Sequence, residues 1–124
     1  MIKMFRIDER LIHGQIAIKW SRHTGVDHIV VGNDAAANSL VLVNSPEDAE
    51  RVVAAVSGIP YINIGNYGRI APEKPGMPRK RYGNNIYCDE VEVESFKHLI
   101  ATGLKCIYQT TPEEPAEDIT TLFK

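Results

Sequence analysis

The sequence predicts an α/β fold, a three-layer α/β/α arrangement with helices on both faces of a mainly parallel central sheet. Short apolar runs rich in β-branched residues alternate along the chain with longer segments in which apolar residues recur every three or four positions. Such runs are typical of strands covered on both faces, and their alternation with helices favours parallel strands joined by crossovers. The 124 residues fit one domain with one core.

The elements follow in order from these patterns. The predicted strands are residues 2–5, 28–32, 40–44, 59–64, 85–88 and 105–109. The predicted helices are one over residues 15–23, one with Ser45 as N-cap and Pro46 at its first position that ends at Gly58, one that opens at Asp89 or Glu90 and ends at Gly103, and a short terminal helix ending at Leu122 and Phe123.

Between the first strand and the first helix lies the run RIDERLIHGQ, residues 6–15, which brings two arginines, two carboxylates and one histidine together. A helix N-terminus carries unpaired N–H groups and a partial positive charge, so it binds anions readily. A neutral imidazole is a good nucleophile near pH 7. The combination predicts that His13 carries a phosphoryl group.

The neighbours of His13 have the chemistry to stabilise that group. The backbone N–H groups of Gly14 and Gln15 would donate to the phosphoryl oxygens, and the guanidinium of Arg10 would bind two of them. Asp8 would either hold Arg10 or orient the imidazole through its other nitrogen. Asp34, at the end of the second strand, is a supporting candidate or an ordinary turn residue.

The run from Arg6 to Gln15 resembles the active-site signature of the enzyme IIB component of the mannose/fructose/sorbose-type sugar phosphotransferase system. In that family the histidine of the matching run is phosphorylated, which implies His13, and its arginine, here Arg10, binds phosphate. The resemblance extends over nearly the whole chain and fades over residues 69–84. It implies a single phosphoryl-carrier domain over residues 1–124.

The implied function is phosphoryl transfer in two steps. A phosphorylated IIA protein or domain would donate to His13, which would pass the group to a sugar imported by the membrane IIC and IID components. Mannose, fructose, sorbose and amino sugars all occur among related systems. One alternative is a regulatory module that signals through phosphorylation of His13. Another, an acid–base enzyme using His13 with Asp8 or Asp34, lacks an evident second catalytic group.

Composition and charge limit the classes of protein to which this chain can belong. The net charge of −2 argues against nucleic acid as a partner, and no apolar run approaches the roughly 20 residues of a membrane span. The start of the chain lacks the apolar segment of a signal peptide, so we expect a cytoplasmic protein, peripherally associated with the membrane permease. Cys88 and Cys106 are expected as small buried hydrophobes. The sequence has no metal-ligand cluster, and the carrier needs no cofactor beyond its histidine.

Two stretches depart from the expected pattern. Residues 65–84 form a long connection with five basic residues and one acidic residue, either a docking surface for an acidic partner or the permease, or a solvated mobile loop. Residues 34–38 look like the start of a helix, yet a strand follows at once, whereas a parallel crossover needs a dozen or more residues. Either the protein has lost a β–α unit between residues 38 and 39, or the sequence joins two segments that are separate in the protein; we favour the second.

Overall fold

The computed structural model describes residues 2–10, 20, 24, 28–31 and 39–123. Most of its strands belong to one mixed sheet with the order β2-β3-β1-β4-β7-β8. These strands are β1 (Ile2–Ile7), β2 (His28–Val31), β3 (Ser39–Val43), β4 (Ile62–Ile64), β7 (Cys106–Tyr108) and β8 (Glu117–Asp118). All pairs are parallel except β7 with β8. The predicted α/β fold with a mainly parallel sheet is confirmed.

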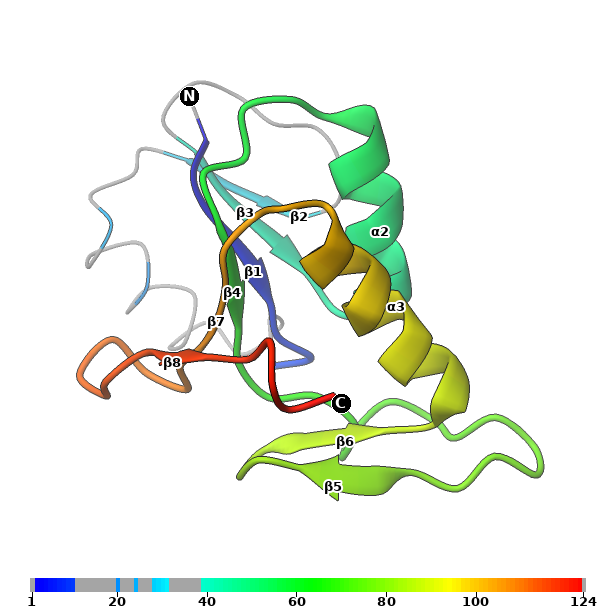
Figure 1. Cartoon of the computed structure of the whole chain (residues 1–124). Helices are drawn as coiled ribbons and strands as arrows, with labels where there is room; N and C mark the ends of the chain where they lie inside the picture. The colour runs from blue at the N-terminus through cyan, green and yellow to red at the C-terminus, as the bar shows by residue number, and fades with distance from the viewer. Residues whose placement is uncertain (1, 11–19, 21–23, 25–27, 32–38, 124) are drawn as a thin grey trace.

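Two helices pack side by side on one face of the sheet, as Figure 1 shows. Helix α2 (Pro46–Ala55) begins as predicted, because the Ser45 side chain accepts from the Asp48 N–H and proline occupies the first turn. Helix α3 (Glu90–Ala101) begins with a capping box between Asp89 and Glu92. Both helices are therefore specified by local sequence at their N-termini.

The side chains of the central strands alternate between two apolar clusters. Phe5 and Ile7 of β1 belong to the large core beneath the helices, together with residues of β3, β4, β7 and α3. Met4 points the other way and packs with Trp20, Leu40 and Leu42. Both faces of the sheet are thus buried, as the continuous apolar runs predicted. Of the helix predicted over 15–23, only Trp20 is among the described residues.

Residues 80–82 were wrongly predicted as part of an irregular connection. They form β5 (Lys80–Tyr82), which pairs antiparallel with β6 (Ile86–Cys88) in a separate hairpin. The loop between them begins with Gly83 at φ +67°, a left-handed conformation that favours glycine. The hairpin lies beyond the ends to which β1 and β4 point (Figure 1).

The predicted terminal helix is also wrong. Glu117 and Asp118 form β8, which pairs with Tyr108 and Ile107, and the chain then turns. The extended path buries Ile119 and brings the Phe123 ring onto Phe96, with 4.9 Å between ring centroids. Sheet pairing and aromatic burial therefore override the helical signal of the acidic residues.

Two other expectations concern single positions. Cys88 and Cys106 are free and buried, as predicted, and burial raises the pKa of the Cys106 thiol to about 11. The junction between residues 38 and 39 lies at the edge of residues 32–38, which are outside the described residues, so the missing β–α unit stays a prediction.

Candidate functional site

The candidate site begins where β1 ends, between its neighbours β3 and β4. Asp8 and Arg10 are described there. The other predicted site residues, His13, Gly14, Gln15 and Asp34, lie outside the described residues. The structure therefore gives the geometry of the support just before His13.

The Asp8 carboxylate holds two arginines. Its Oδ1 accepts from the backbone N–H of Arg10 at 2.9 Å and from Arg10 Nε at 3.0 Å, and its Oδ2 accepts from Arg10 Nη2 at 2.8 Å. Arg6 Nη2 donates to the same Oδ2 at 2.9 Å. One buried carboxylate thus faces two guanidinium groups, so this cluster of three side chains carries one excess positive charge, and Arg10 lies three residues before His13.

Arg10 is fixed on one side and open on the other. Its side chain is 17% exposed, and Nη2 also donates to the carbonyl of Thr110 at 3.3 Å. Within the part of the chain that the structure describes, no acceptor lies at Arg10 Nη1. A guanidinium held in this way is preorganised to donate to an oxyanion.

Arg6 is fully buried and connects three strands. Its Nη1 donates to Asn63 Oδ1 on β4 and to the carbonyl of Gln109 after β7 at 2.9 Å. Its guanidinium also lies over the Trp20 ring, 4.1 Å from the centroid. Burial lowers the pKa of Arg6 to about 10 against the opposing effect of Asp8, so Arg6 stays charged at neutral pH.

Gly65 provides the space for this pair. A Cβ at position 65 would lie 2.3 Å from Arg6 Nη2 and 2.4 Å from Asp8 Oδ2. Only glycine therefore fits beside the ion pair. The sequence interpretation assigned no role to Gly65, Asn63 or the burial of Arg6, although the position of Asn63 and Gly65 at the end of a central strand was a usable signal.

Glu9 joins the turn to the segment after β4, residues 66–71. Its Oε2 accepts from the backbone N–H of Arg69 at 2.9 Å, and its Oε1 accepts from those of Ile70 and Ala71 at 3.2 and 3.1 Å. Its own N–H donates to the carbonyl of Asn66 at 3.0 Å. The sequence interpretation missed this role, because a contact across 60 residues has no local signature.

A second buried cluster holds the connection against α3. Arg79 binds Glu92 through Nε and Nη2, each at 2.9 Å, and its Nη1 donates to the carbonyls of Gly68 and Ala71. The Tyr67 hydroxyl also donates to Glu92. Burial alone would raise the pKa of Glu92, but the hydrogen bonds from Arg79 and Tyr67 outweigh it and lower the pKa to about 2.

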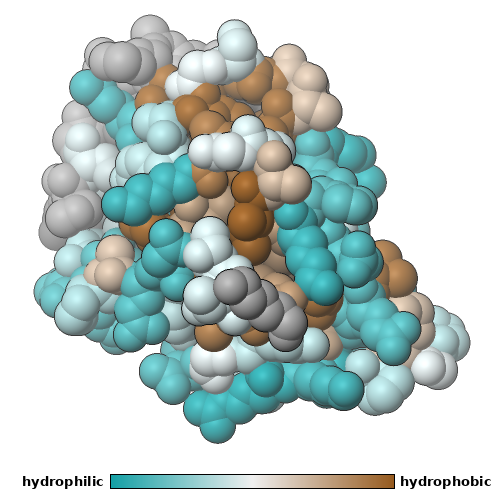
Figure 2. Space-filling view, in the orientation of Figure 1, coloured by the Kyte–Doolittle hydropathy of each residue, from teal (hydrophilic) through white to brown (hydrophobic). Residues whose placement is uncertain are grey.

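The five basic residues of the connection therefore divide into two groups. Arg79 is paired with Glu92, and Lys74 lies 3.2 Å from carboxylate oxygens of both Glu47 and Asp89. Among the described residues, no carboxylate pairs with the other three, Arg69, Lys80 and Arg81. Figure 2 shows hydrophilic surface at the end of the molecule where the hairpin lies.

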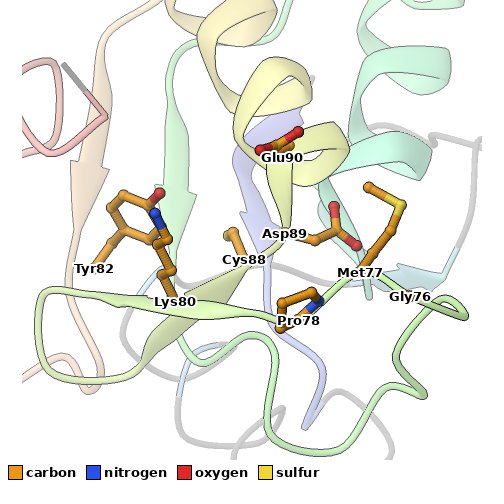
Figure 3. Close-up of a pocket in the computed structure, with 8 residues that line it drawn as sticks. All are labelled: Gly76, Met77, Pro78, Lys80, Tyr82, Cys88, Asp89 and Glu90. Atoms are coloured by element: carbon orange, nitrogen blue, oxygen red, sulfur yellow. The ribbon is translucent and has the colours of Figure 1, made fainter.

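A cavity of about 190 Å³ lies apart from the turn, between the hairpin and the start of α3. In Figure 3, Lys80 and Tyr82 line it from the hairpin, Asp89 and Glu90 from the helix, and Met77 from the connection. None of the described residues of the turn, 8–10, lines this cavity. The described residues hold no cluster of three or more histidine, cysteine, aspartate or glutamate side chains that suits a metal ion. Within the same residues, no helix is long and apolar enough to cross a membrane.

Comparison with known proteins identifies relatives. Residues 2–40, which include β1 and the turn, match the family described as the PTS system sorbose subfamily IIB component. This part of the chain is similar to the sorbose-subfamily IIB components. The resemblance carried by residues 6–15 is thus confirmed. The sorbose-type match covers the positions of every predicted site residue.

Two relatives from Escherichia coli K12 extend this finding. The mannose-specific EIIAB component is 25% identical over 154 residues, covering 93% of this chain and 46% of the relative, so the chain spans about half the length of that protein. The N-acetylgalactosamine-specific phosphotransferase enzyme IIB component 2 is 44% identical over 46 residues, covering 37% of this chain and 29% of the relative.

Solved structures of IIB components share the fold. The IIBSor domain of the sorbose permease from Klebsiella pneumoniae superposes with a TM-score of 0.78 at 22% identity, covering 96% of this chain and 93% of that chain. The N-acetylgalactosamine-specific IIB component 1 from Escherichia coli gives a TM-score of 0.78 at 20% identity, covering 96% and 99%. At these identities the likeness establishes the fold.

Proposed function

We propose that the chain is the phosphoryl carrier of a sugar phosphotransferase system. His13 accepts a phosphoryl group from a phosphorylated IIA histidine and passes it to a sugar imported by membrane IIC and IID components. The observation that carries this proposal is the pair of arginines on one buried carboxylate, of which Arg10 lies three residues before His13. The kinship with IIB components supports the same chemistry.

The two phosphoryl transfers need no cofactor. In the first, a ring nitrogen of His13 forms a bond to phosphorus as the donor's P–N bond breaks, and the electron pair stays on the donor imidazole. In the second, a sugar hydroxyl forms the new P–O bond, the electron pair of the P–N bond returns to His13, and the hydroxyl proton is lost to a base on the permease side. Positioning and charge stabilisation supply most of the catalysis.

The residues before His13 have separate parts in these steps. Arg10 is held by Asp8 through Nε and Nη2, and its remaining nitrogen, Nη1, donates to phosphoryl oxygens. Gly14 and Gln15 contribute backbone N–H groups, and Asp34 is a supporting residue. Asp8 keeps Arg10 in place, and Arg6 offsets the charge of Asp8, which leaves the charge of Arg10 for the phosphoryl group.

This function places the carrier in the cytoplasm, against the membrane components. The purified chain is incubated with each of several phosphorylated IIA proteins, and its intact mass is measured. We expect the wild type to gain one acid-labile phosphoryl group and the His13→Ala variant to gain none. The control variant His98→Ala, changed at an exposed histidine on α3, should gain the group as the wild type does. Acceptance by His13→Ala, or no gain with any IIA protein, contradicts the proposal.

A further inference from the structure

Ile70 is an apolar side chain in an unusual place. Among the described residues, the large hydrophobic side chains that remain exposed are those of Ile70, at 57%, and Val91, at 45%. Val91 lies on α3. Ile70, by contrast, lies in the segment bound by Glu9, and Glu9 precedes His13 by four residues.

The backbone that carries Ile70 is held from two sides. The Glu9 carboxylate accepts three consecutive N–H groups, including that of Ile70 itself. Arg79 Nη1 donates to the carbonyls of Gly68 and Ala71, at 3.2 and 2.5 Å. Two buried charges therefore fix the chain on both sides of an exposed apolar side chain, so that little further ordering entropy is lost when a partner binds it.

Positive charge lies beside Ile70. Arg69 stacks on Tyr87, with its guanidinium carbon 5.1 Å from the ring centroid, and its Nη2 donates to the Tyr87 hydroxyl at 3.2 Å. That hydrogen bond, with the nearby charges of Arg69 and Arg81, lowers the pKa of the Tyr87 hydroxyl. Both arginines therefore act on one half-buried aromatic side chain.

We propose that Ile70, with Arg69 next to it in the chain and Arg81 near the Tyr87 ring that Arg69 covers, anchors the protein that donates the phosphoryl group to His13. Its complement is an apolar hollow rimmed by aspartate or glutamate side chains. A donor that reaches His13 approaches the turn to which the Ile70 segment is bound, and an acidic rim on the donor complements Arg69 and Arg81. This inference rests on the proposed function and adds a docking residue that does not contact the reacting atoms.

The first test separates docking from chemistry. A phosphorylated IIA protein that loads the wild-type chain is used at varied concentration, and initial rates of transfer are measured. Ile70→Asp is expected to raise KM for the donor at least tenfold and to leave kcat within twofold. Val91→Asp, the matched exposed position, is expected to change neither constant. A KM for Ile70→Asp equal to that of the wild type overturns the proposal.

A second measurement does not depend on transfer. Titration of the unphosphorylated IIA protein into the chain gives Kd, which we expect to weaken with added salt and in Arg69→Glu and Ile70→Asp. If the wild type accepts no phosphoryl group yet binds IIA through Ile70, the carrier function fails and the docking surface stands. If transfer occurs and Kd is the same in all variants, the docking surface fails. If these substitutions weaken binding only to membrane components or to a second copy of the chain, and not to IIA, the proposal is also contradicted.

Discussion

At the scale of single residues, the account depends on Asp8, which is 1% exposed and accepts from two arginines. The sequence interpretation proposed that Asp8 holds Arg10 or orients His13. The geometry shows the contact with Arg10, and it adds Arg6, whose burial no local pattern indicates. The burial of Arg6 could not be predicted from the apolar strand around it, because its partners come from β4 and from the chain after β7.

Asp8→Asn should therefore be strongly destabilising. It leaves the buried Arg6 without its charge partner, and such a loss costs about 3–5 kcal/mol. Asp48→Asn is the matched control, since its partner Arg51 is exposed and the pair is worth less than about 1 kcal/mol. Urea unfolding measures both free energies. Equal small losses in the two variants would show that the Asp8 pair is not structural.

Gly65→Ala tests the close approach at the same pair. The added Cβ would displace Arg6 and Asp8, at a cost of about 1–3 kcal/mol in the free energy of unfolding. Phosphoryl acceptance should fall as well, because Arg10 shares Asp8. Gly65→Ala that unfolds at the wild-type urea concentration and is loaded at the wild-type rate would argue against a tight fit.

At the scale of elements, α2, α3 and the central strands were predictable because their signals are local. Ser45 and Pro46 start α2, and the Asp89 capping box starts α3. The hairpin strand 80–82 and the terminal strand were missed. Their formation depends on pairing with β6 and β7 and on the burial of Phe123 against Phe96, which only the folded chain brings together.

The hydrogen bonds to Glu92 make stability depend on pH in a defined window. Because the folded pKa of about 2 lies below the ordinary value of 4.5, the ionised carboxylate stabilises the fold above pH 4.5. That contribution is lost as pH falls from 4.5 towards 2. Unfolding free energies measured across this range should fall in the wild type and fall less steeply in Glu92→Gln. Identical slopes would contradict the role of Glu92.

Phe123→Ala tests the corrected C-terminal structure. The variant removes a 3% exposed ring stacked on Phe96 and should lower the free energy of unfolding by about 3 kcal/mol. Val91→Ala, at an exposed position on α3, is the control and should change it little. A negligible loss for Phe123→Ala would show that the end of the chain does not pack on the core.

At the scale of the whole molecule, the fold brings the ends of β1, β4 and β7 together at one edge, where α/β proteins place their sites. Asn63 donates to Gln109 there, so the network around Arg6 spans all three strands. The connection after β4 is fastened to this edge by Glu9 and to α3 by Arg79. The molecule thus presents a turn with a supported arginine, and beside it a fixed segment with an exposed apolar side chain.

The link between β2 and β3 remains the least ordinary feature of the molecule. The two strands are parallel neighbours, yet seven residues separate them in sequence. A parallel crossover normally needs a dozen or more. We predict that the purified protein is heavier than 13.8 kDa by a β–α unit. An intact mass near 13.8 kDa would instead show that the short junction is real.

The measurement that tests the central claim most directly is the fate of the phosphoryl group when Arg10 is changed. We predict that Arg10→Ala is loaded by phosphorylated IIA about 100-fold more slowly than the wild type and loses its phosphoryl group faster, because one preorganised donor to the oxyanion is gone. Arg51→Ala, at an exposed site on α2, should match the wild type. If Arg10→Ala is loaded and holds the group as the wild type does, the Arg10 guanidinium is not part of the phosphoryl site.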